Sequence, residues 1–350
     1  MMELLRPWML PGPAAFVARM CSLADRHKVV VLHAPFASAS VAEALRHHIG
    51  REGRYSVIPV NLDAQEPFES SLAASAGLAT SSSLAALVTS PVLQYAAIVV
   101  FSRGPPDSGL ASFARMIARQ PLEERPILLV VSEDGGCVLE GHALEPVRDV
   151  FGPLDGAAYA AALPRGGRPL EARLVASVAI EVAAWDVVLL DRLTALPPEQ
   201  AVRPDLHLAA WDNGETARWR GMAPTWEKGC LDDWGGEPTE HVLWIAANRP
   251  SALAKRVWRG QLAMLLPWIE QYRQAIIEQE KRNLRPDITR SGPDIESLDW
   301  GPLAFQLDRV PNVKRLAHAF REARNELAHG RPILWSHVRL CIDAARAWRR

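Results

Sequence analysis

The chain has 350 residues, of which 49% are hydrophobic and 23% are charged, and its formal net charge is −1. This length predicts two or three domains, because a single hydrophobic core rarely serves more than about 250–300 residues. No apolar run approaches the roughly 20 residues that a membrane-spanning helix requires, which excludes an integral membrane protein of the helical class. Pro7, Pro11 and Pro13 interrupt the first apolar stretch, so no signal peptide is expected.

Charge is distributed unevenly along the chain. Residues 251–350 carry 18 Lys and Arg against 11 Asp and Glu, a balance of +7, and the totals of 39 and 40 leave −8 for residues 1–250. A basic C-terminal region is compatible with an anionic partner such as RNA, and equally with a solvated helical surface.

The cysteines are too far apart to suggest a shared site. Cys21, Cys137, Cys230 and Cys341 are each separated by more than 90 positions, and none belongs to a CxxC pair. This spacing predicts neither a disulfide framework nor structural zinc, and we expect no metal or other cofactor. Scattered thiols of this kind are typical of the reducing cytoplasm.

The first part of the chain alternates apolar runs with amphipathic segments. Short runs rich in Val and Ile occur at 27–34, 55–63, 95–102 and 125–133, and helical patterns such as 40–49 and 109–120 lie between them. This alternation predicts an α/β domain with a parallel sheet covered by helices on both faces. We expect this domain to span residues 1–165.

Two further regions follow. Residues 166–250 begin with helical sequence and continue as an irregular stretch with Trp211, Trp219, Trp226, Trp234 and Trp244, for which core or domain-interface packing is favoured over stacking on bases. Residues 251–350 predict an all-α bundle of one helix at 251–282, a second from Asn312 to Gly330 and a last one after Pro332. Pro267 is expected to kink the first of these helices.

The turn after the first predicted strand lies where a P-loop nucleotide-binding protein carries GxxxxGK[ST]. In "KVVVLHAPFASASVAEAL", Ala34 and Ala39 replace the two glycines, Ser40 replaces the lysine and Val41 replaces the Ser/Thr. These changes remove the backbone that wraps the phosphates, the charge that matches them and the hydroxyl ligand of Mg²⁺. The sequence therefore predicts a domain that does not hydrolyse ATP.

The third predicted strand agrees with this interpretation, since it ends in Ser102 and Arg103 where a Walker B strand ends in acidic residues. In element order and in the position of the altered loop, the N-terminal region resembles the inactive STAND-type NTPase domains of prokaryotic conflict systems. An α/β fold that never bound a nucleotide is the alternative.

Near the C-terminus, "RNELAH" places Arg324 and His329 five residues apart at the end of a long helix, with the polar Asn325 directly after the arginine. The string resembles the Arg-polar-x-x-x-His signature of HEPN domains, over about 100 residues of basic, helical sequence. This resemblance implies metal-independent RNA cleavage by a homodimer, with His329 moving protons, Arg324 stabilising the phosphorane and Asn325 orienting the site.

In that interpretation the cations around the motif bind RNA: Lys314, Arg315, Arg321 and Arg331. The resemblance also implies a bacterial defence or toxin-type system, a partner protein from that system, and control by the N-terminal domain. Two alternatives stay open, a non-catalytic adaptor that binds a partner protein and a helical domain of another kind.

Other residue clusters carry weaker signals. His47 and His48 have no third ligand in view, and Arg331 and His337 form a second Arg–His pair that Pro332 interrupts. The acidic stretch at 232–240 is expected to be a loop, in which solvated charges are favoured over acid–base chemistry.

Overall fold

A computed structural model describes residues 7–36, 38–62, 66–104, 107–123, 125–133, 139, 142, 144–163, 169–208, 219–287 and 294–349. The predicted features at Cys137 and Trp211 lie outside these residues. The chain forms two compact units: unit 1 comprises Met1–Asp155 with Ala223–Glu240, and unit 2 comprises Gly156–Met222 with His241–Arg350. This division differs from the expected three parts, because residues 166–250 are shared between the two units.

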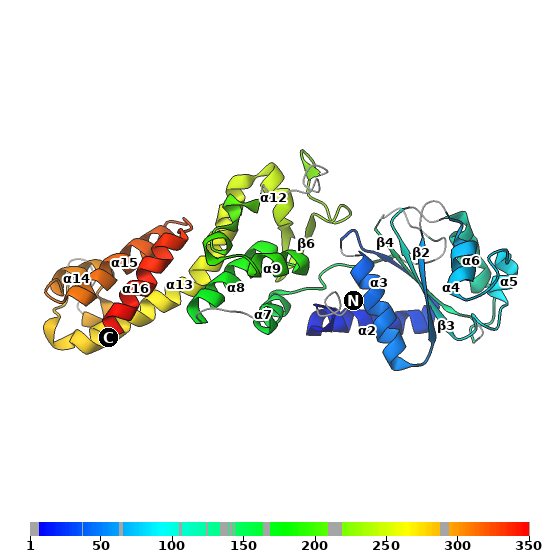
Figure 1. Cartoon of the computed structure of the whole chain (residues 1–350), viewed down its shortest axis with the longest axis horizontal. Helices are drawn as coiled ribbons and strands as arrows, with labels where there is room; N and C mark the ends of the chain where they lie inside the picture. The colour runs from blue at the N-terminus through cyan, green and yellow to red at the C-terminus, as the bar shows by residue number, and fades with distance from the viewer. Residues whose placement is uncertain are drawn as a thin grey trace. The chain divides into compact units, whose positions relative to one another are not determined.

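Unit 1 is built on a five-stranded parallel sheet of order β2-β3-β4-β1-β5 (Figure 1). The four predicted strands are confirmed as β1 (Val29–His33), β2 (Ser56–Leu62), β3 (Ala96–Ser102) and β4 (Ile127–Ser132). The fifth strand, β5 (Leu144–Pro146), was not expected from the sequence. It has three residues and no apolar run, and it forms by pairing in parallel with β1.

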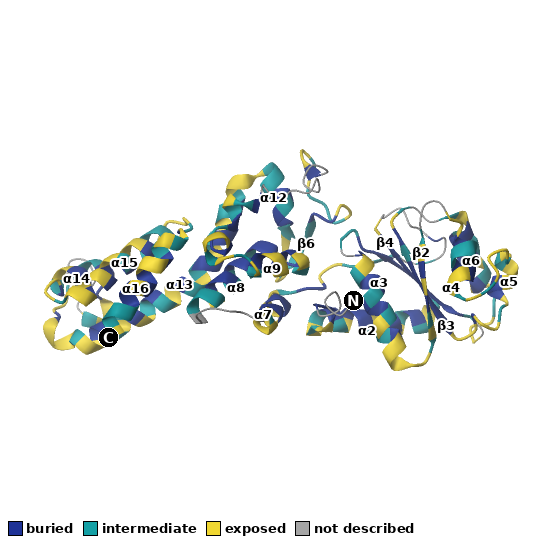
Figure 2. Cartoon of the chain, in the orientation of Figure 1, coloured by how far each residue is buried: buried dark blue, intermediate teal, exposed yellow. Residues whose placement is uncertain are grey.

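Helices cover both faces of this sheet, as the alternation of the sequence predicts. Side chains of one face, such as Val31, Ile98 and Val130, pack against Phe68 and Phe113 in a buried core. Figure 2 shows the central strands buried beneath these helices. The helices of unit 1 are α2 (Pro11–His27), α3 (Ser38–Glu52), α4 (Phe68–Ser75), α5 (Leu84–Val88) and α6 (Ser108–Ala118), after a short 3-10 turn η1 (Pro7–Met9).

The acidic stretch expected as a loop is a β-hairpin instead. Strand β6 (Leu231–Trp234) pairs antiparallel with β7 (Glu237–Glu240). Gly235 and Gly236 have φ values of +66° and +84°, the left-handed conformations that a two-residue type I′ hairpin turn requires. The Gly-Gly pair was the local signal for this turn, and the charged residues around it concealed it.

Unit 2 is helical, and it confirms the predicted helical character of the C-terminal region. Helix α13 continues through Pro267 for 31 residues. The helices are α7 (Pro153–Ala162, whose first residues belong to unit 1), α8 (Pro169–Ala183), α9 (Val187–Thr194), α10 (Pro198–Ala201), α12 (Val242–Asn248), α13 (Pro250–Glu280), α14 (Trp300–Gln306), α15 (Pro311–Ala328) and α16 (Trp335–Arg349), with 3-10 turns η2 (Pro204–Leu206), η4 (Lys281–Asn283) and η5 (Ile295–Ser297).

The second half of α13 packs against α15 through aromatic rings. Phe320 lies 4.8 Å from Trp268, 5.4 Å from Tyr272 and 5.3 Å from Trp300 between ring centroids. Of the tryptophans between the two long helical regions, Trp219 and Trp244 are buried, which agrees with a core role for these two. Among the described residues, no helix is long and apolar enough to span a bilayer.

The first half of α13 crosses α8 at a close contact that only glycine allows. A Cβ on Gly260 would lie 2.6 Å from the Cα of Val178 and 2.8 Å from the carbonyl oxygen of Ser177. The Ser177 hydroxyl also donates a 2.8 Å hydrogen bond to the Gly260 carbonyl. Because these neighbours are backbone atoms, a side chain here requires the two helices to separate.

We therefore predict that Gly260→Ala lowers the free energy of unfolding by about 1–3 kcal/mol, the usual cost of overpacking a core. The matched control is Gly301→Ala in α14, where an added Cβ meets no atom within 4 Å. That variant should be neutral or gain up to about 1 kcal/mol from helix propensity. Urea unfolding followed by tryptophan fluorescence measures both, and equal effects of the two substitutions would contradict the close contact.

Candidate functional site

The end of α15 is fixed by a Schellman motif. Gly330 has a φ of +73°, the N–H of Arg331 bonds the carbonyl of Glu326 at 3.0 Å, and the N–H of Gly330 bonds that of Leu327 at 3.2 Å. The indole N–H of Trp258 in α13 donates to the same Leu327 carbonyl at 2.6 Å. These contacts hold the C-cap residue, His329, in an exposed position at the tip of the helix.

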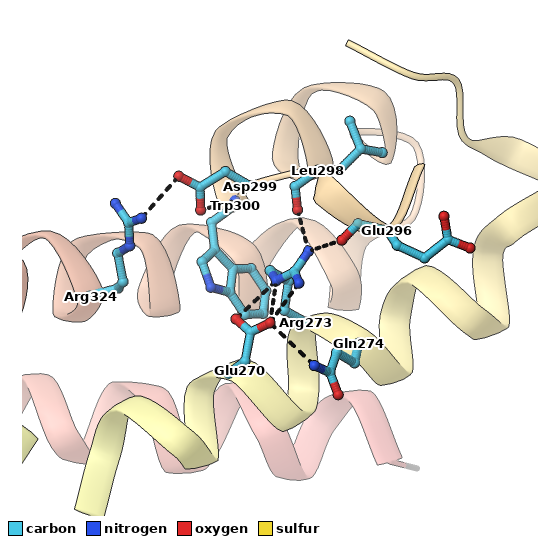
Figure 3. A network of polar contacts seen from close by, with 8 residues as sticks. All are labelled: Glu270, Arg273, Gln274, Glu296, Leu298, Asp299, Trp300 and Arg324. Carbon is cyan, nitrogen blue, oxygen red and sulfur yellow. Dashed lines mark hydrogen bonds and ion pairs between the residues drawn. The ribbon is translucent and has the colours of Figure 1, made fainter. Parts of the chain in front are cut away.

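Arg324 lies more than one turn earlier and faces α14. Its guanidinium nitrogen Nη2 is 3.4 Å from Oδ2 of Asp299, and Oδ1 of Asp299 accepts the backbone N–H of Trp300 at 2.8 Å as the N-cap of α14 (Figure 3). The side chains of Arg324 and Asp299 are 40% and 46% exposed. An ion pair this exposed contributes little to stability, so solvent and solutes can still reach the Arg324 guanidinium.

A second arginine positions Asp299. Arg273 of α13 is paired with Glu270, and its Nη1 donates to the carbonyl oxygens of Glu296 and Leu298, both at 2.7 Å. Figure 3 shows Arg273 between the helix and the segment that leads into α14. These bonds fix that segment on α13 and bring Asp299, 25 positions before Arg324 in the sequence, to the side of Arg324.

A cavity of about 490 Å³ opens beside this network. Its lining combines two carboxylates and two guanidinium groups with apolar side chains. The lining residues are Leu266, Ile269, Glu270, Arg273, Ser297, Leu298, Asp299, Trp300 and Arg324. Because the charges are paired with one another, the cavity wall that contains Arg324 is nearly neutral as a whole.

The structure does not bring the two predicted catalytic side chains into contact. Arg324 and His329 form no hydrogen bond or ion pair with each other, as five helical positions place them about 140° apart around the axis. Asn325 is half-buried between them and makes no side-chain hydrogen bond in the described part of the chain.

The predicted RNA-binding cations fall into two groups. Lys314, Arg315 and Arg321 are exposed on α15, and within the described ranges no carboxylate pairs with them. Arg331 forms a two-pronged ion pair with Glu326, with Nε–Oε2 and Nη2–Oε1 distances of 2.7 and 2.8 Å. The charge of Arg331 is therefore partly neutralised, whereas the other three remain available to an anion.

The sequence alone did not identify Glu326 as a residue with Arg331, His329 and His337 around it. The hydrogen bond from Arg331 lowers the pKa of Glu326, and Arg331, His329 and His337 contribute further through their charges. The left-handed turn at Gly330 folds the chain back and brings residues from both sides of Pro332 around this carboxylate. Nδ1 of His337 is buried there, with no hydrogen-bond partner among the residues that the structure describes.

No group of three or more His, Cys, Asp or Glu side chains in the described ranges could hold a metal ion. His47 and His48 lie on α3, where His48 Nε2 is 3.4 Å from Glu52.

Comparison with protein-family models, with curated proteins and with solved structures finds no significant match to this chain.

The exposed Arg324–Asp299 pair leads to a stability prediction. Asp299→Asn retains an oxygen that can cap α14 and removes only the charge, so it should change the free energy of unfolding by less than about 0.5 kcal/mol. Asp299→Ala also removes the cap and should cost about 1 kcal/mol. Chemical unfolding of both variants checks this, and a large loss in Asp299→Asn would show that the ion pair is structural.

Proposed function

We propose that this protein is a metal-independent RNA endonuclease of a bacterial defence or toxin-type system, in which Arg324 and His329 act at a site shared by two copies of the chain. The observation that supports this best is the accessibility of both side chains at the end of one rigid helix. The Schellman motif presents His329, and Arg324 is held only by a half-exposed ion pair.

The proposed reaction needs a proton carrier and a cation, and no metal. His329 accepts the proton of a ribose 2′-OH, the 2′-oxygen attacks the adjacent phosphorus, and the bond from phosphorus to the 5′-oxygen breaks as His329 gives that proton to the leaving 5′-oxygen. Arg324 stabilises the negative charge of the pentacoordinate phosphorane. The products are a 2′,3′-cyclic phosphate and a 5′-OH end.

The positions of the two side chains favour a dimer in this proposal. Since Arg324 and His329 point to different sides of α15, one chain alone does not offer both groups to a single phosphate. Two chains that meet along α15 can combine the arginine of one copy with the histidine of the other. Asn325, between them on the helix, then orients the site, and the exposed cations Lys314, Arg315 and Arg321 bind the RNA backbone.

In this proposal unit 1 is a degenerate P-loop-like domain that controls the nuclease in the cytoplasm without hydrolysing a nucleotide, and it receives its signal from a partner protein. The pairing of Arg324 with Asp299 favours a second candidate. An arginine whose charge is already matched also suits a non-catalytic adaptor, whose bundle mediates assembly with that partner.

The test is cleavage of total RNA with EDTA present throughout. We predict that His329→Ala and Arg324→Ala each lower the cleavage rate by at least about 10²-fold, because each removes a group that acts in the transition state. His318→Ala is the matched control, since His318 is exposed on the same helix and lies 11 positions before His329. Products of the wild type should carry cyclic-phosphate ends.

Two outcomes would contradict the nuclease. Equal cleavage by wild type and both variants would point to a contaminating ribonuclease. Absence of cleavage by a wild-type dimer, together with absence of toxicity in cells, would favour the adaptor. Sedimentation velocity establishes the oligomeric state of the preparation used.

A further inference from the structure

Unit 1 has a topological switch point between β1 and β4. The connection that leaves β1 leads to β2 at one side of the sheet, and the connection that leaves β4 leads past β1 to β5 at the other side. In open parallel sheets, the carboxyl ends of two such strands border the crevice in which ligands bind. Here His33 ends β1 and Ser132 ends β4, paired in register.

In this protein a later segment of the same chain lies over the end of β1. The ring of Trp226 meets that of His33 edge-on, with centroids 4.6 Å apart and an interplanar angle of 81°. Gly229, at a φ of +67°, lies so close that a Cβ would be 3.0 Å from the Pro35 carbonyl oxygen. His33 is almost completely buried. Trp226 and Gly229 thus cover the residues at the carboxyl end of β1.

A second set of contacts fixes the same segment just after β5. Oδ1 of Asp232 accepts the backbone N–H of Asp149 at 3.0 Å, and Oδ2 of Asp233 is 3.0 Å from Nε of Arg148. A Cβ on Gly235 would lie 3.3 Å from Cγ of Pro153. We call residues 225–235 the strap.

Both ends of the strap continue into unit 2 and meet there. Met222 and His241 belong to unit 2, and the rings of Trp219 and His241 are 5.1 Å apart. His241 is buried, with Nε2 3.1 Å from Oδ2 of the buried Asp186. The strap is therefore a loop that leaves unit 2 and returns to it at one anchored place.

Several features make the contacts of the strap with the rest of unit 1 weaker than those of the sheet. The strap includes β6, which pairs with β7 in a two-stranded hairpin outside the five-stranded sheet, and such hairpins have little stability of their own. Arg148 is 45% exposed in its ion pair with Asp233. Burial, with a contribution from the adjacent charge of Asp233, raises the pKa of Asp232 to about 6, against the effects of two backbone N–H groups and Arg148.

We propose that residues 225–235 form a detachable strap that closes the switch-point crevice of unit 1 and opens locally while both units stay folded. Opening exposes His33 and Pro35, which Trp226 and Gly229 cover in the closed form. A partner that binds these residues competes with the strap and shifts the population toward the open form. Since the strap ends are anchored in unit 2, its release is a route for the control that the proposed function assigns to unit 1.

Cys230 lies within the strap and reports its opening. The thiol is completely buried and contacts the backbone of Thr225, with Sγ 3.4 Å from both N and O. Cys21 in unit 1 and Cys341 in unit 2 are also buried, at 8% and 2% exposure, and serve as internal references. Alkylation of the native protein, read for each cysteine separately by mass spectrometry, compares strap opening with the unfolding of each unit.

We predict that Cys230 reacts at least about tenfold faster than Cys21 and Cys341, after each rate is divided by that of the unfolded protein. Arg148→Ala should increase the alkylation rate of Cys230 several-fold and leave those of Cys21 and Cys341 unchanged, because it removes the ion pair with Asp233. The matched control is Arg51→Ala, an exposed arginine of unit 1 outside the strap contacts.

The raised pKa of Asp232 determines how the opening of the strap depends on pH. The closed form favours protonated Asp232, so the strap is most firmly closed near pH 4 and opens more as the pH rises through about 6. Asp232→Asn keeps the oxygen that accepts the two N–H groups, and at pH 8 it should slow the labelling of Cys230 by at least about tenfold, since each pKa unit corresponds to a tenfold change. Near pH 4 the variant and the wild type should differ much less.

Two results would overturn the proposal: equal normalised alkylation rates for the three cysteines, or faster alkylation of all three in Arg148→Ala. Either would show that the strap opens only when unit 1 unfolds. Neither result depends on RNA cleavage. The proposed nuclease and the strap therefore fail or succeed in separate experiments.

Discussion

Helix α13 is the constraint on which the organisation of unit 2 depends, because other elements are placed by what they bury against it. Its first half allows the close approach of α8 at Gly260, and its second half presents the rings that enclose Phe320 of α15. Between them, the fully buried Gln261 donates to the carbonyls of Val202 and Ile333 and accepts the N–H of Ile333. A buried amide with all these bonds satisfied fixes the turn after α15, and with it the surroundings of His329.

The charges near the candidate site show why a basic region need not be a basic surface throughout. Arg273, Arg324 and Arg331 each face a carboxylate from their own unit, at Glu270, Asp299 and Glu326. Within the described ranges, Lys314, Arg315 and Arg321 of α15 are exposed without such a partner and contribute to the positive balance of residues 251–350. In the proposed function, an anionic ligand drawn to that helix has to compete with Asp299 before it reaches Arg324.

Two features of unit 1 both disfavour the binding of a phosphate group at the carboxyl end of β1. The turn after β1 carries Ala34, Ala39 and Ser40 at the spacing where a phosphate-binding loop has two glycines and a lysine, and the strap lies on the residues that follow β1. The Glu133 carboxylate accepts a hydrogen bond from the hydroxyl of Ser38, the first residue of α3. Negative charge therefore already lies at the N-terminus of this helix, a position that favours anions. In the proposed mechanism, a partner that displaces the strap therefore shifts unit 1 from its closed to its open form.

The sequence by itself determined the central strands, the long helices and the end of α15, because apolar periodicity, Gly330 and Pro332 act over a few neighbouring residues. Only the tertiary structure decided that β5 pairs with β1, that residues 223–240 belong to unit 1, and that Asp299 faces Arg324. It likewise gathered His329, Arg331 and His337 around Glu326. These contacts join segments that are far apart in the sequence, so local sequence patterns do not predict them. They form only where the folded chain packs two surfaces together.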